Sequence, residues 1–176
     1  MEMANRLGGN MNKYLILCVD DERDILDSVL NDLAPLEEYF VIEAAESVAE
    51  ARDVIADAMA DHLPLALVLC DHIMPEETGI DFLIALKQHS ITTDAKKLLL
   101  TGQAGLEDTI QAVNTASLDY YIAKPWNGEQ LLSVIKAQLT DFVIDHEKEL
   151  MPWARILDTE KIFEYISTNR IQMSTE

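Results

Sequence analysis

Residues that could do chemistry follow four apolar runs of this sequence. Asp20 and Asp21 close "YLILCVDD", Asp71 closes "LALVLCD", Thr101 closes "KKLLLT" and Lys124 closes "LDYYIAK". Were these runs neighbouring parallel strands, three carboxylates, one hydroxyl and one ammonium would meet at one edge of the sheet. Crowded carboxylates repel by roughly 4 kcal/mol per pair at about 4 Å and an effective dielectric constant of about 20. We therefore expect a divalent cation among them. Mg²⁺ suits because it takes carboxylate oxygens and leaves positions open for phosphate oxygens.

Each of these residues also has an ordinary structural explanation. Asp21 or the following Glu22 would favour a helix N-terminus through the helix dipole, Thr101 would satisfy backbone groups at a strand end, and Lys124 would be solvated. These explanations account poorly for all of the residues together. The set instead fits phosphoryl chemistry, with Asp71 as the nucleophile, Lys124 neutralising phosphoryl oxygens and the Thr101 hydroxyl reaching the acyl phosphate.

Several other chemistries lack their motifs in the sequence. It has no GxxxxGK[ST] loop to cradle a nucleotide phosphate and no GxGxxG after the first apolar run. A GxSxG elbow is also absent, and no histidine is placed for a serine or cysteine triad. Phosphoryl transfer to Asp71 is what remains.

The elements that must position these residues alternate between strands and helices. Continuous apolar runs predict strands at 14–20, 39–45, 65–71, 96–102 and 118–124, and helix-period segments predict helices at 21–34, 47–59, 79–89, 106–113 and 128–139. Strands that are apolar throughout are covered on both faces, as in a parallel sheet between two helix layers. The sequence therefore predicts a doubly wound α/β fold with five parallel strands, whose site lies beyond the carboxyl ends of the strands.

The composition narrows the class of protein. The chain has 176 residues, 49% of them hydrophobic, and a formal net charge of −19. Such a charge argues against nucleic acid and anionic membranes as partners, because their binding depends on Lys and Arg. The sequence shows neither a signal peptide nor an apolar stretch of membrane-spanning length. Cys18 and Cys70 lie in apolar strands, and we interpret them as buried thiols of a cytoplasmic protein.

At this point the sequence resembles the receiver domain of two-component response regulators. The resemblance rests on "VDDE" (19–22), "DHIMPEETG" (71–79), "LTG" (100–102) and "YYIAKPW" (120–126), and it runs from about 13 to 139. It implies a flavodoxin-like sheet with strand order 2-1-3-4-5. Residues 1–12 are then a loose leader, 13–140 the receiver domain, and 141–176 a helical C-terminal extension.

The resemblance assigns roles to single residues. It makes Asp71 the phosphoacceptor for a sensor histidine kinase or a phosphotransfer protein, and Asp20 and Asp21 the acids that bind Mg²⁺ with Asp71. The backbone carbonyl of Ile73 is implied as a further metal ligand. Thr101 and Lys124 correspond to the residues that contact the phosphoryl group.

Further positions concern the switch and the lifetime of the modification. Thr101 and Tyr121 match the hydroxyl and the aromatic residue that report phosphorylation, with Tyr120 as a competitor for the aromatic role. In the family, positions equivalent to Ile73 and Gln103 tune the phosphoryl lifetime. Because Ile73 has no polar side-chain atom to orient a water molecule, we expect a long-lived phosphoaspartate. His72 is interpreted as a packing or solvent-facing residue outside the chemistry.

The segment after residue 140 allows several interpretations. Leu132, Ile135, Leu139 and Phe142 fit a coiled-coil seam that would form a homodimer, but His146, Glu149 and Pro152 interrupt it. A short helix is predicted at 157–167, capped by Asp158 or Thr159. This segment either packs back on the receiver, burying Trp153 and Phe163, or contacts a second chain or a partner. It is acidic and too short for a helix-turn-helix, so we expect no DNA-binding output.

The leading hypothesis is a phosphorylation-switched signalling protein that acts through an unidentified downstream protein, with no catalysis beyond its own phosphorylation and slow dephosphorylation. One alternative is a receiver module of a longer regulator whose output domain is missing. A remote alternative is a phosphohydrolase of the haloacid dehalogenase type. That family requires a second Asp two residues after the nucleophile, where this sequence has Ile73.

Overall fold

The computed structural model describes residues 14–102 and 105–173. The strands are β1 (Leu15–Val19), β2 (Val41–Ala45), β3 (Leu65–Cys70), β4 (Lys96–Thr101) and β5 (Tyr120–Ala123). The α-helices are α1 (Arg23–Leu33), α2 (Val48–Ala60), α3 (Gly79–Gln88), α4 (Leu106–Thr115), α5 (Gly128–His146) and α6 (Thr159–Met173). Two 3₁₀ helices, η1 (Ala34–Leu36) and η2 (Met151–Arg155), follow α1 and α5.

The five strands form one parallel sheet in the order β2-β1-β3-β4-β5. This confirms the predicted fold class and strand order. Val19 at the end of β1 pairs with Cys70 at the end of β3, so the residues that follow them leave the sheet at the same level. The register thus brings the acids after β1 and β3 to one edge, as parallel pairing requires.

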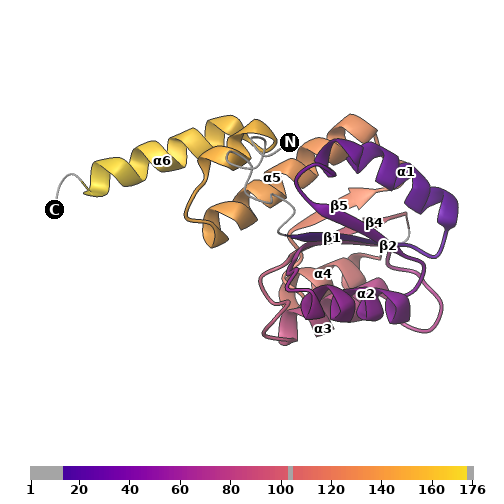
Figure 1. Cartoon of the computed structure of the whole chain (residues 1–176). Coiled ribbons are helices and arrows are strands. Elements are labelled where there is room, and N and C mark those ends of the chain that lie inside the picture. Colours follow the sequence, from indigo (N-terminus) through magenta and orange to yellow (C-terminus); the bar gives the residue numbers. More distant parts are fainter. Residues whose placement is uncertain (1–13, 103–104, 174–176) are drawn as a thin grey trace.

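Helices cover both faces of the sheet. Figure 1 shows α1 and α5 on one face and α2, α3 and α4 on the other. Every residue of β1 and β3 is buried, because these central strands face helices on both sides. Their apolar side chains divide between two hydrophobic clusters, one on each face of the sheet.

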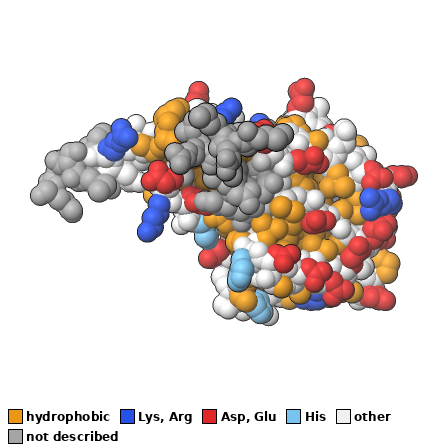
Figure 2. Space-filling view, viewed as in Figure 1, with side chains coloured by type: hydrophobic (Ala, Val, Ile, Leu, Met, Phe, Trp, Pro, Cys, Tyr) orange, Lys and Arg blue, Asp and Glu red, His pale blue; other side chains and the backbone are white. Residues whose placement is uncertain are grey.

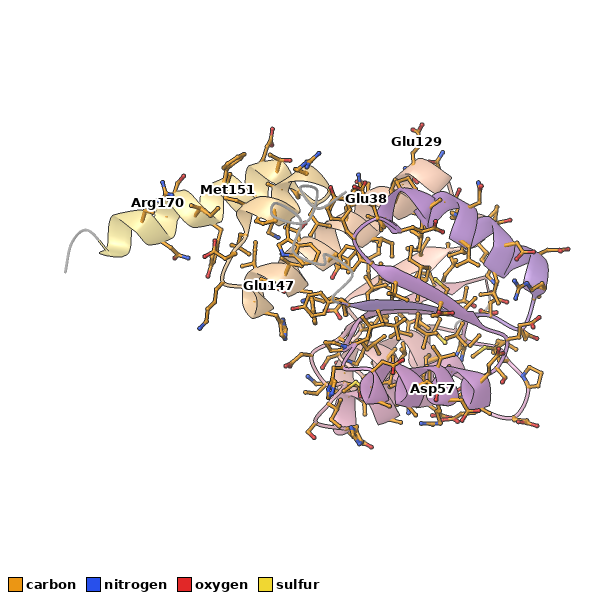
Figure 3. The ribbon with its side chains drawn as sticks, viewed as in Figure 1. Glu38, Asp57, Glu129, Glu147, Met151 and Arg170 are labelled. Atoms are coloured by element: carbon orange, nitrogen blue, oxygen red, sulfur yellow. The ribbon has the colours of Figure 1, made fainter. Side chains whose placement is uncertain are left out.

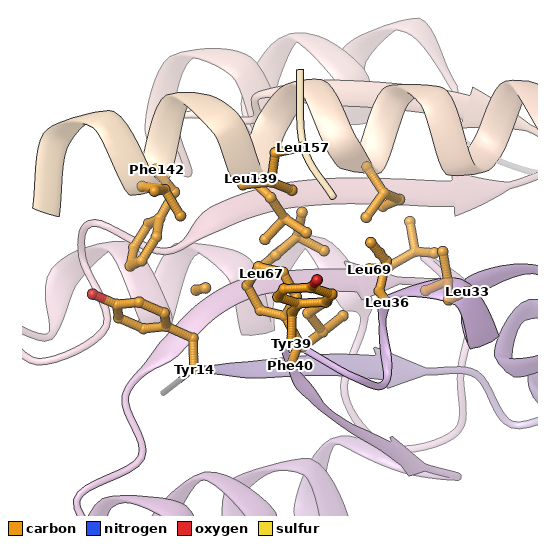
Figure 4. Close-up of a cluster of buried hydrophobic side chains, with 14 of the residues drawn as sticks. Tyr14, Leu33, Leu36, Tyr39, Phe40, Leu67, Leu69, Leu139, Phe142 and Leu157 are labelled. Carbon is orange, nitrogen blue, oxygen red and sulfur yellow. The ribbon is translucent and has the colours of Figure 1, made fainter. Parts of the chain in front are cut away.

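The segment after α5 packs back on the α/β domain and extends one of these clusters. Trp153 of η2 is buried, with its ring 6.0 Å from that of Tyr14 and 5.4 Å from that of Phe40. The Tyr14 hydroxyl also donates a 2.8 Å hydrogen bond to the Glu147 carboxylate. Figure 4 shows part of this cluster, in which Tyr14, Phe40 and Phe142 lie together with aliphatic side chains. The predicted burial of Trp153 is confirmed.

The structure decides two further points about the same region. Ile135, Leu139 and Phe142 are buried in the chain's own core, so the stripe on α5 offers no free coiled-coil seam. The expected burial of Phe163 is wrong: Phe163 is 46% exposed, whereas Ile162 is buried and Ile166, one turn later, packs against the same cluster. Figures 1 and 3 show that α6 then projects away from the sheet and carries Arg170 with it.

The start of α6 agrees with the predicted cap, since the Asp158 carboxylate accepts a hydrogen bond from the Lys161 backbone N–H at 3.1 Å. Within the described ranges, none of the helices combines the length and the apolar character needed to cross a membrane.

Candidate functional site

The acids that follow β1 and β3 lie together at the carboxyl edge of the sheet. Asp20, Asp21 and Asp71 each offer an oxygen, and these oxygens all lie within 4.8 Å of one another. Asp20 and Asp71 are buried, whereas Asp21 is exposed. The structure thus brings together the three carboxylates that the sequence predicted to converge.

Lys124 reaches the same place from the end of β5. Its Nζ lies 2.7 Å from Asp20 Oδ2 and 3.2 Å from Asp71 Oδ2, so it bridges the two buried carboxylates. Burial lowers the pKa of Lys124, but the hydrogen bonds and charges of the two carboxylates outweigh it and hold the pKa above its ordinary value. The ammonium is therefore charged at neutral pH and supplies the positive side of the site.

The burial of Asp20 beside Asp71 changes the pKa of the Asp20 carboxyl. Burial raises the pKa of its carboxyl above the ordinary value and the Asp71 charge adds to the rise, while Lys124 and the backbone N–H of Glu22 lower it. That N–H donates to Asp20 Oδ1 at 2.9 Å. A further positive charge at this edge would relieve the repulsion.

The donor set fits a hard divalent cation. Three carboxylate oxygens within one coordination sphere, one of them open to solvent at Asp21, match the oxygen ligands and retained waters of Mg²⁺. The described residues place no His or Cys in this group, which favours an oxygen-preferring ion over zinc.

The loop after β3 holds Asp71 in place through its backbone. The His72 N–H donates to Asp71 Oδ1 at 2.7 Å, and the Gly79 N–H donates to the His72 carbonyl at 2.8 Å. Gly79 is required because a Cβ at this position would lie 1.8 Å from the carbonyl oxygen of Asp71. The first residue of α3 thus lies against the backbone of Asp71, while the His72 N–H holds its carboxylate.

Thr101 of β4 and Tyr121 of β5 belong to neighbouring strands, where Thr101 pairs with Ala123 and Tyr121 pairs with Leu99. Thr101 is buried at the end of β4, and the Tyr121 hydroxyl donates to its backbone carbonyl at 3.3 Å. Tyr120, the competitor for the aromatic role, is 45% exposed and points to the other side of the strand. The contact with Thr101 therefore supports Tyr121.

The remaining sequence-predicted residues have different surroundings. The Ile73 side chain is half exposed in the loop between β3 and α3. Gln103 lies outside the described residues. His72 is buried, not solvent-facing, and its imidazole Nε2 lies 3.4 Å from Asp108 Oδ2 in the first turn of α4.

Sequence reasoning missed two structural features of this edge. Gly79 was quoted only as part of a motif, although its close approach to Asp71 is a specific packing requirement. Trp126, just after Lys124, donates from its indole N–H to Asp32 Oδ2 of α1 at 2.8 Å. The contact between Trp126 and Asp32 joins segments whose distance depends on the strand order, whereas the approach of Gly79 to Asp71 depends on the path of the loop between β3 and α3.

The family model for the response regulator receiver domain matches residues 16–136, and this chain belongs to that family. It is similar to the transcriptional regulatory protein CpxR of Escherichia coli (strain K12), with 35% identity over 129 residues, 73% of this chain and 50% of CpxR. It is also similar to the hydrogenase transcriptional regulatory protein HoxA of Cupriavidus necator, with 31% identity over 121 residues, 69% of this chain and 23% of HoxA. The chain thus spans a quarter to a half of the length of these relatives.

Solved structures show the same fold. A receiver domain protein (CheY-like) from Methanospirillum hungatei JF-1 is 33% identical with a TM-score of 0.62, covering 73% of this chain and 95% of that one. The beryllofluoride-activated NtrC4 receiver domain dimer is 25% identical with a TM-score of 0.61, covering 73% of this chain and 98% of that one. This chain is therefore a receiver domain, a phosphorylation-switched signalling module, with a helical C-terminal extension.

Proposed function

We propose that this receiver accepts a phosphoryl group on Asp71 from the phosphohistidine of a sensor histidine kinase or of a phosphotransfer protein. The observation that carries the proposal is the convergence at Asp71. Its carboxylate lies 3.2 Å from the Lys124 ammonium and within 4.8 Å of oxygens of both Asp20 and Asp21. In the cytoplasm, where we place the protein, such a kinase is the natural donor.

The chemical step is an in-line displacement at phosphorus. A carboxylate oxygen of Asp71 attacks, the new O–P bond forms, and the P–N bond of the donor breaks; the departing imidazole keeps the electron pair and takes up a proton. Lys124 is placed to neutralise a phosphoryl oxygen, because its Nζ already faces the Asp71 carboxylate. Asp20, Asp21, Asp71 and the Ile73 carbonyl would hold a Mg²⁺ ion, which when bound supplies positive charge to the transferred group.

We propose that Thr101 and Tyr121 form the switch. The phosphoryl group adds about −1.5 to −2 charges at Asp71, which attracts the Thr101 hydroxyl. Because the Tyr121 hydroxyl is bonded to the carbonyl of Thr101, movement of Thr101 loosens the contact that holds this ring. The result is a population shift between two arrangements of α4, β5 and α5.

The surface that changes would bind the downstream protein. Ile110 and Val113 of α4 and Tyr120 of β5 are about half exposed. Tyr120 also lines a groove between β5 and α5 that reaches Trp126. Exposed apolar patches of this kind mark contact sites for proteins. Acidic side chains are spread among apolar ones on the visible face around α1 and α2 (Figure 2). Together with a net charge of −19, they disfavour contact between this chain and nucleic acid.

A second candidate is the receiver part of a longer regulator. The partial coverage of CpxR and HoxA, both named as transcriptional regulators, favours it. DNA binding would then belong to a domain outside this chain. The mass of the natural protein, detected in cell extract with an antibody raised against this chain, separates the two: a mass near 19.8 kDa favours the first, and a larger protein that shifts DNA favours the second.

The phosphoryl lifetime is a further part of the proposal. The apolar, half-exposed Ile73 side chain offers no group to orient an attacking water, so dephosphorylation should be slow. Ile73→Asn supplies such a group, and we expect it to change the first-order rate of phosphate release; an unchanged rate would remove this residue from the account.

The experiment that tests the proposed function is intact-mass spectrometry after incubation with acetyl phosphate and Mg²⁺. We expect the addition of one phosphoryl group, lost in Asp71→Asn and in the presence of a chelator, and retained in Asp81→Asn, an exposed Asp of α3. The absence of any addition to the unmodified chain would overturn the proposal.

A further inference from the structure

His72 directly follows the acceptor, and its side chain is buried against α4. Only 5% of the residue is exposed, and the imidazole Nε2 lies 3.4 Å from Asp108 Oδ2. Asp108 belongs to the first turn of α4 and has a half-exposed side chain. Within residues 14–102 and 105–173, Nδ1 of the same ring has no hydrogen-bond partner. The imidazole therefore has one polar contact in the described part of the chain, and that contact is with α4.

The backbone of His72 is tied to the acceptor. Its N–H donates to Asp71 Oδ1 at 2.7 Å, and its carbonyl accepts from the Gly79 N–H at 2.8 Å. One residue thus contacts the reacting carboxylate through its backbone and α4 through its side chain. A phosphoryl group on Asp71 changes the charge and bonding of the carboxylate that anchors this residue.

The first turn of α4 is held from a second side. The chain runs from Thr101 at the end of β4 into α4 at Leu106, so a shift of Thr101 toward the phosphoryl group would pull on the start of this helix. The contact between His72 and Asp108 opposes such a shift, because it fixes the same turn to the loop after β3.

We propose that His72 and Asp108 form a latch that holds α4 in its unphosphorylated arrangement, so that His72 is a positioning residue for the switch. This inference rests on the proposed phosphorylation of Asp71. It adds a contact that determines how strongly phosphorylation at that site is coupled to the position of α4. Opening the latch makes the phosphorylated arrangement more accessible. By linkage, a variant without the latch binds a phosphoryl mimic more tightly, because less free energy is spent on moving α4.

Simple packing predicts the opposite direction. If His72 only fills space, its loss loosens the acceptor loop and weakens binding of any phosphoryl mimic. If Asp108 only favours the helix N-terminus through the dipole, its neighbour Glu107 has the same effect. Glu107 is exposed, lies in the same turn and carries the same charge, so Glu107→Gln is the matched control for Asp108→Asn.

The experiment compares the unmodified chain with Asp108→Asn, His72→Leu, the double variant and Glu107→Gln. Hydrogen–deuterium exchange of α4 amides, measured without a phosphodonor, reports the latch itself. Calorimetric titration with beryllium fluoride in excess Mg²⁺ reports the coupling. We expect each latch variant to exchange faster in α4 and to bind the mimic about threefold to tenfold more tightly. The double variant should gain no more than the stronger single variant, because both remove one contact.

Each other outcome has a definite meaning. If Asp108→Asn and Glu107→Gln show the same amide exchange in α4, the latch is overturned. It is also overturned if Asp108→Asn exchanges faster but does not bind beryllium fluoride more tightly. Neither result affects the proposed phosphorylation of Asp71. Should the unmodified chain fail to bind beryllium fluoride, the proposed function is wrong and the coupling falls with it. The half-exposed Asp108 keeps the test valid if His72→Leu does not fold.

Discussion

Replacing Gly79 by Ala tests whether the loop between β3 and α3, which begins with Asp71, packs as closely against Gly79 as the structure shows. The added Cβ would lie 1.8 Å from the carbonyl oxygen and 2.8 Å from the carbonyl carbon of Asp71, and 3.0 Å from Cys70 Sγ. Two of these atoms are backbone at the end of a buried strand, so relief requires the loop or α3 to move. Overpacking of this kind destabilises by about 1–3 kcal/mol.

Two smaller effects modify this figure. The bond from the Gly79 N–H to the His72 carbonyl would be strained, and losing such a bond removes about 1 kcal/mol. Ala also lowers the conformational entropy of the unfolded chain, which stabilises the folded state by about 0.4–1 kcal/mol. We therefore expect the free energy of unfolding to fall by about 1–3.6 kcal/mol, which for a chain of this size lowers Tm by about 2–14 °C.

The assay is urea and thermal unfolding followed by circular dichroism, with Gly102→Ala as the matched control. A Cβ at position 102 would lie 3.7 Å from Lys124 Cβ, an ordinary contact, so this variant should unfold within about 0.5 kcal/mol of the parent. Because Asp71 must move in Gly79→Ala, its phosphorylation by acetyl phosphate should slow by up to about a hundredfold. Equal stability of the two variants would refute the close approach.

Three further outcomes follow from particular contacts. Trp153→Ala should lower the free energy of unfolding by about 3–5 kcal/mol in urea titrations, because it leaves a cavity in the core beside Tyr14. Met151 is exposed, so Met151→Ala should change this free energy little. Equal effects would contradict the packing of the C-terminal extension. Burial lowers the pKa of Lys97 to about 8, below that of the unfolded chain, so the unfolded state binds more protons between about pH 8 and 10.5. The stability of the parent relative to Lys97→Met should then rise with pH in that window by at most about 1.4 kcal/mol per unit, and a flat difference would disprove the shift. Asp21→Asn should weaken Mg²⁺ binding in calorimetry at least about tenfold while the exposed Asp24→Asn does not, and matching affinities would exclude Asp21 as a ligand.

The sequence predicted the fold and the acids well, for a physical reason. A strand apolar on both faces, such as "LALVLC", must lie inside a covered sheet, and the Asp71 that follows it must emerge at the edge. The meeting of Lys124 with Asp20, which are 104 residues apart, depends on the strand order. The order came from the family resemblance and not from periodicity.

Other features could not be obtained in this way. Ile162 and Phe163 are neighbours in α6 but lie about 100° apart around the helix axis, so they face different ways. The sequence did not decide which face packs; in the structure it is the one with Ile162 and Ile166. His72 was interpreted as outside the chemistry because a single histidine in a loop carries no pattern. Its burial against Asp108 appears only once α4 is packed beside the acceptor loop.

The central claim, that Asp71 is the residue that carries the phosphoryl group, is tested most directly by trapping the modified side chain. The chain is phosphorylated with acetyl phosphate and Mg²⁺, reduced with borohydride, which converts an acyl phosphate to an alcohol, and mapped by peptide mass spectrometry. We predict that Asp71 alone is converted to homoserine. Conversion at Asp20 or Asp21, or a phosphorylated chain without any reduced aspartate, would contradict the account.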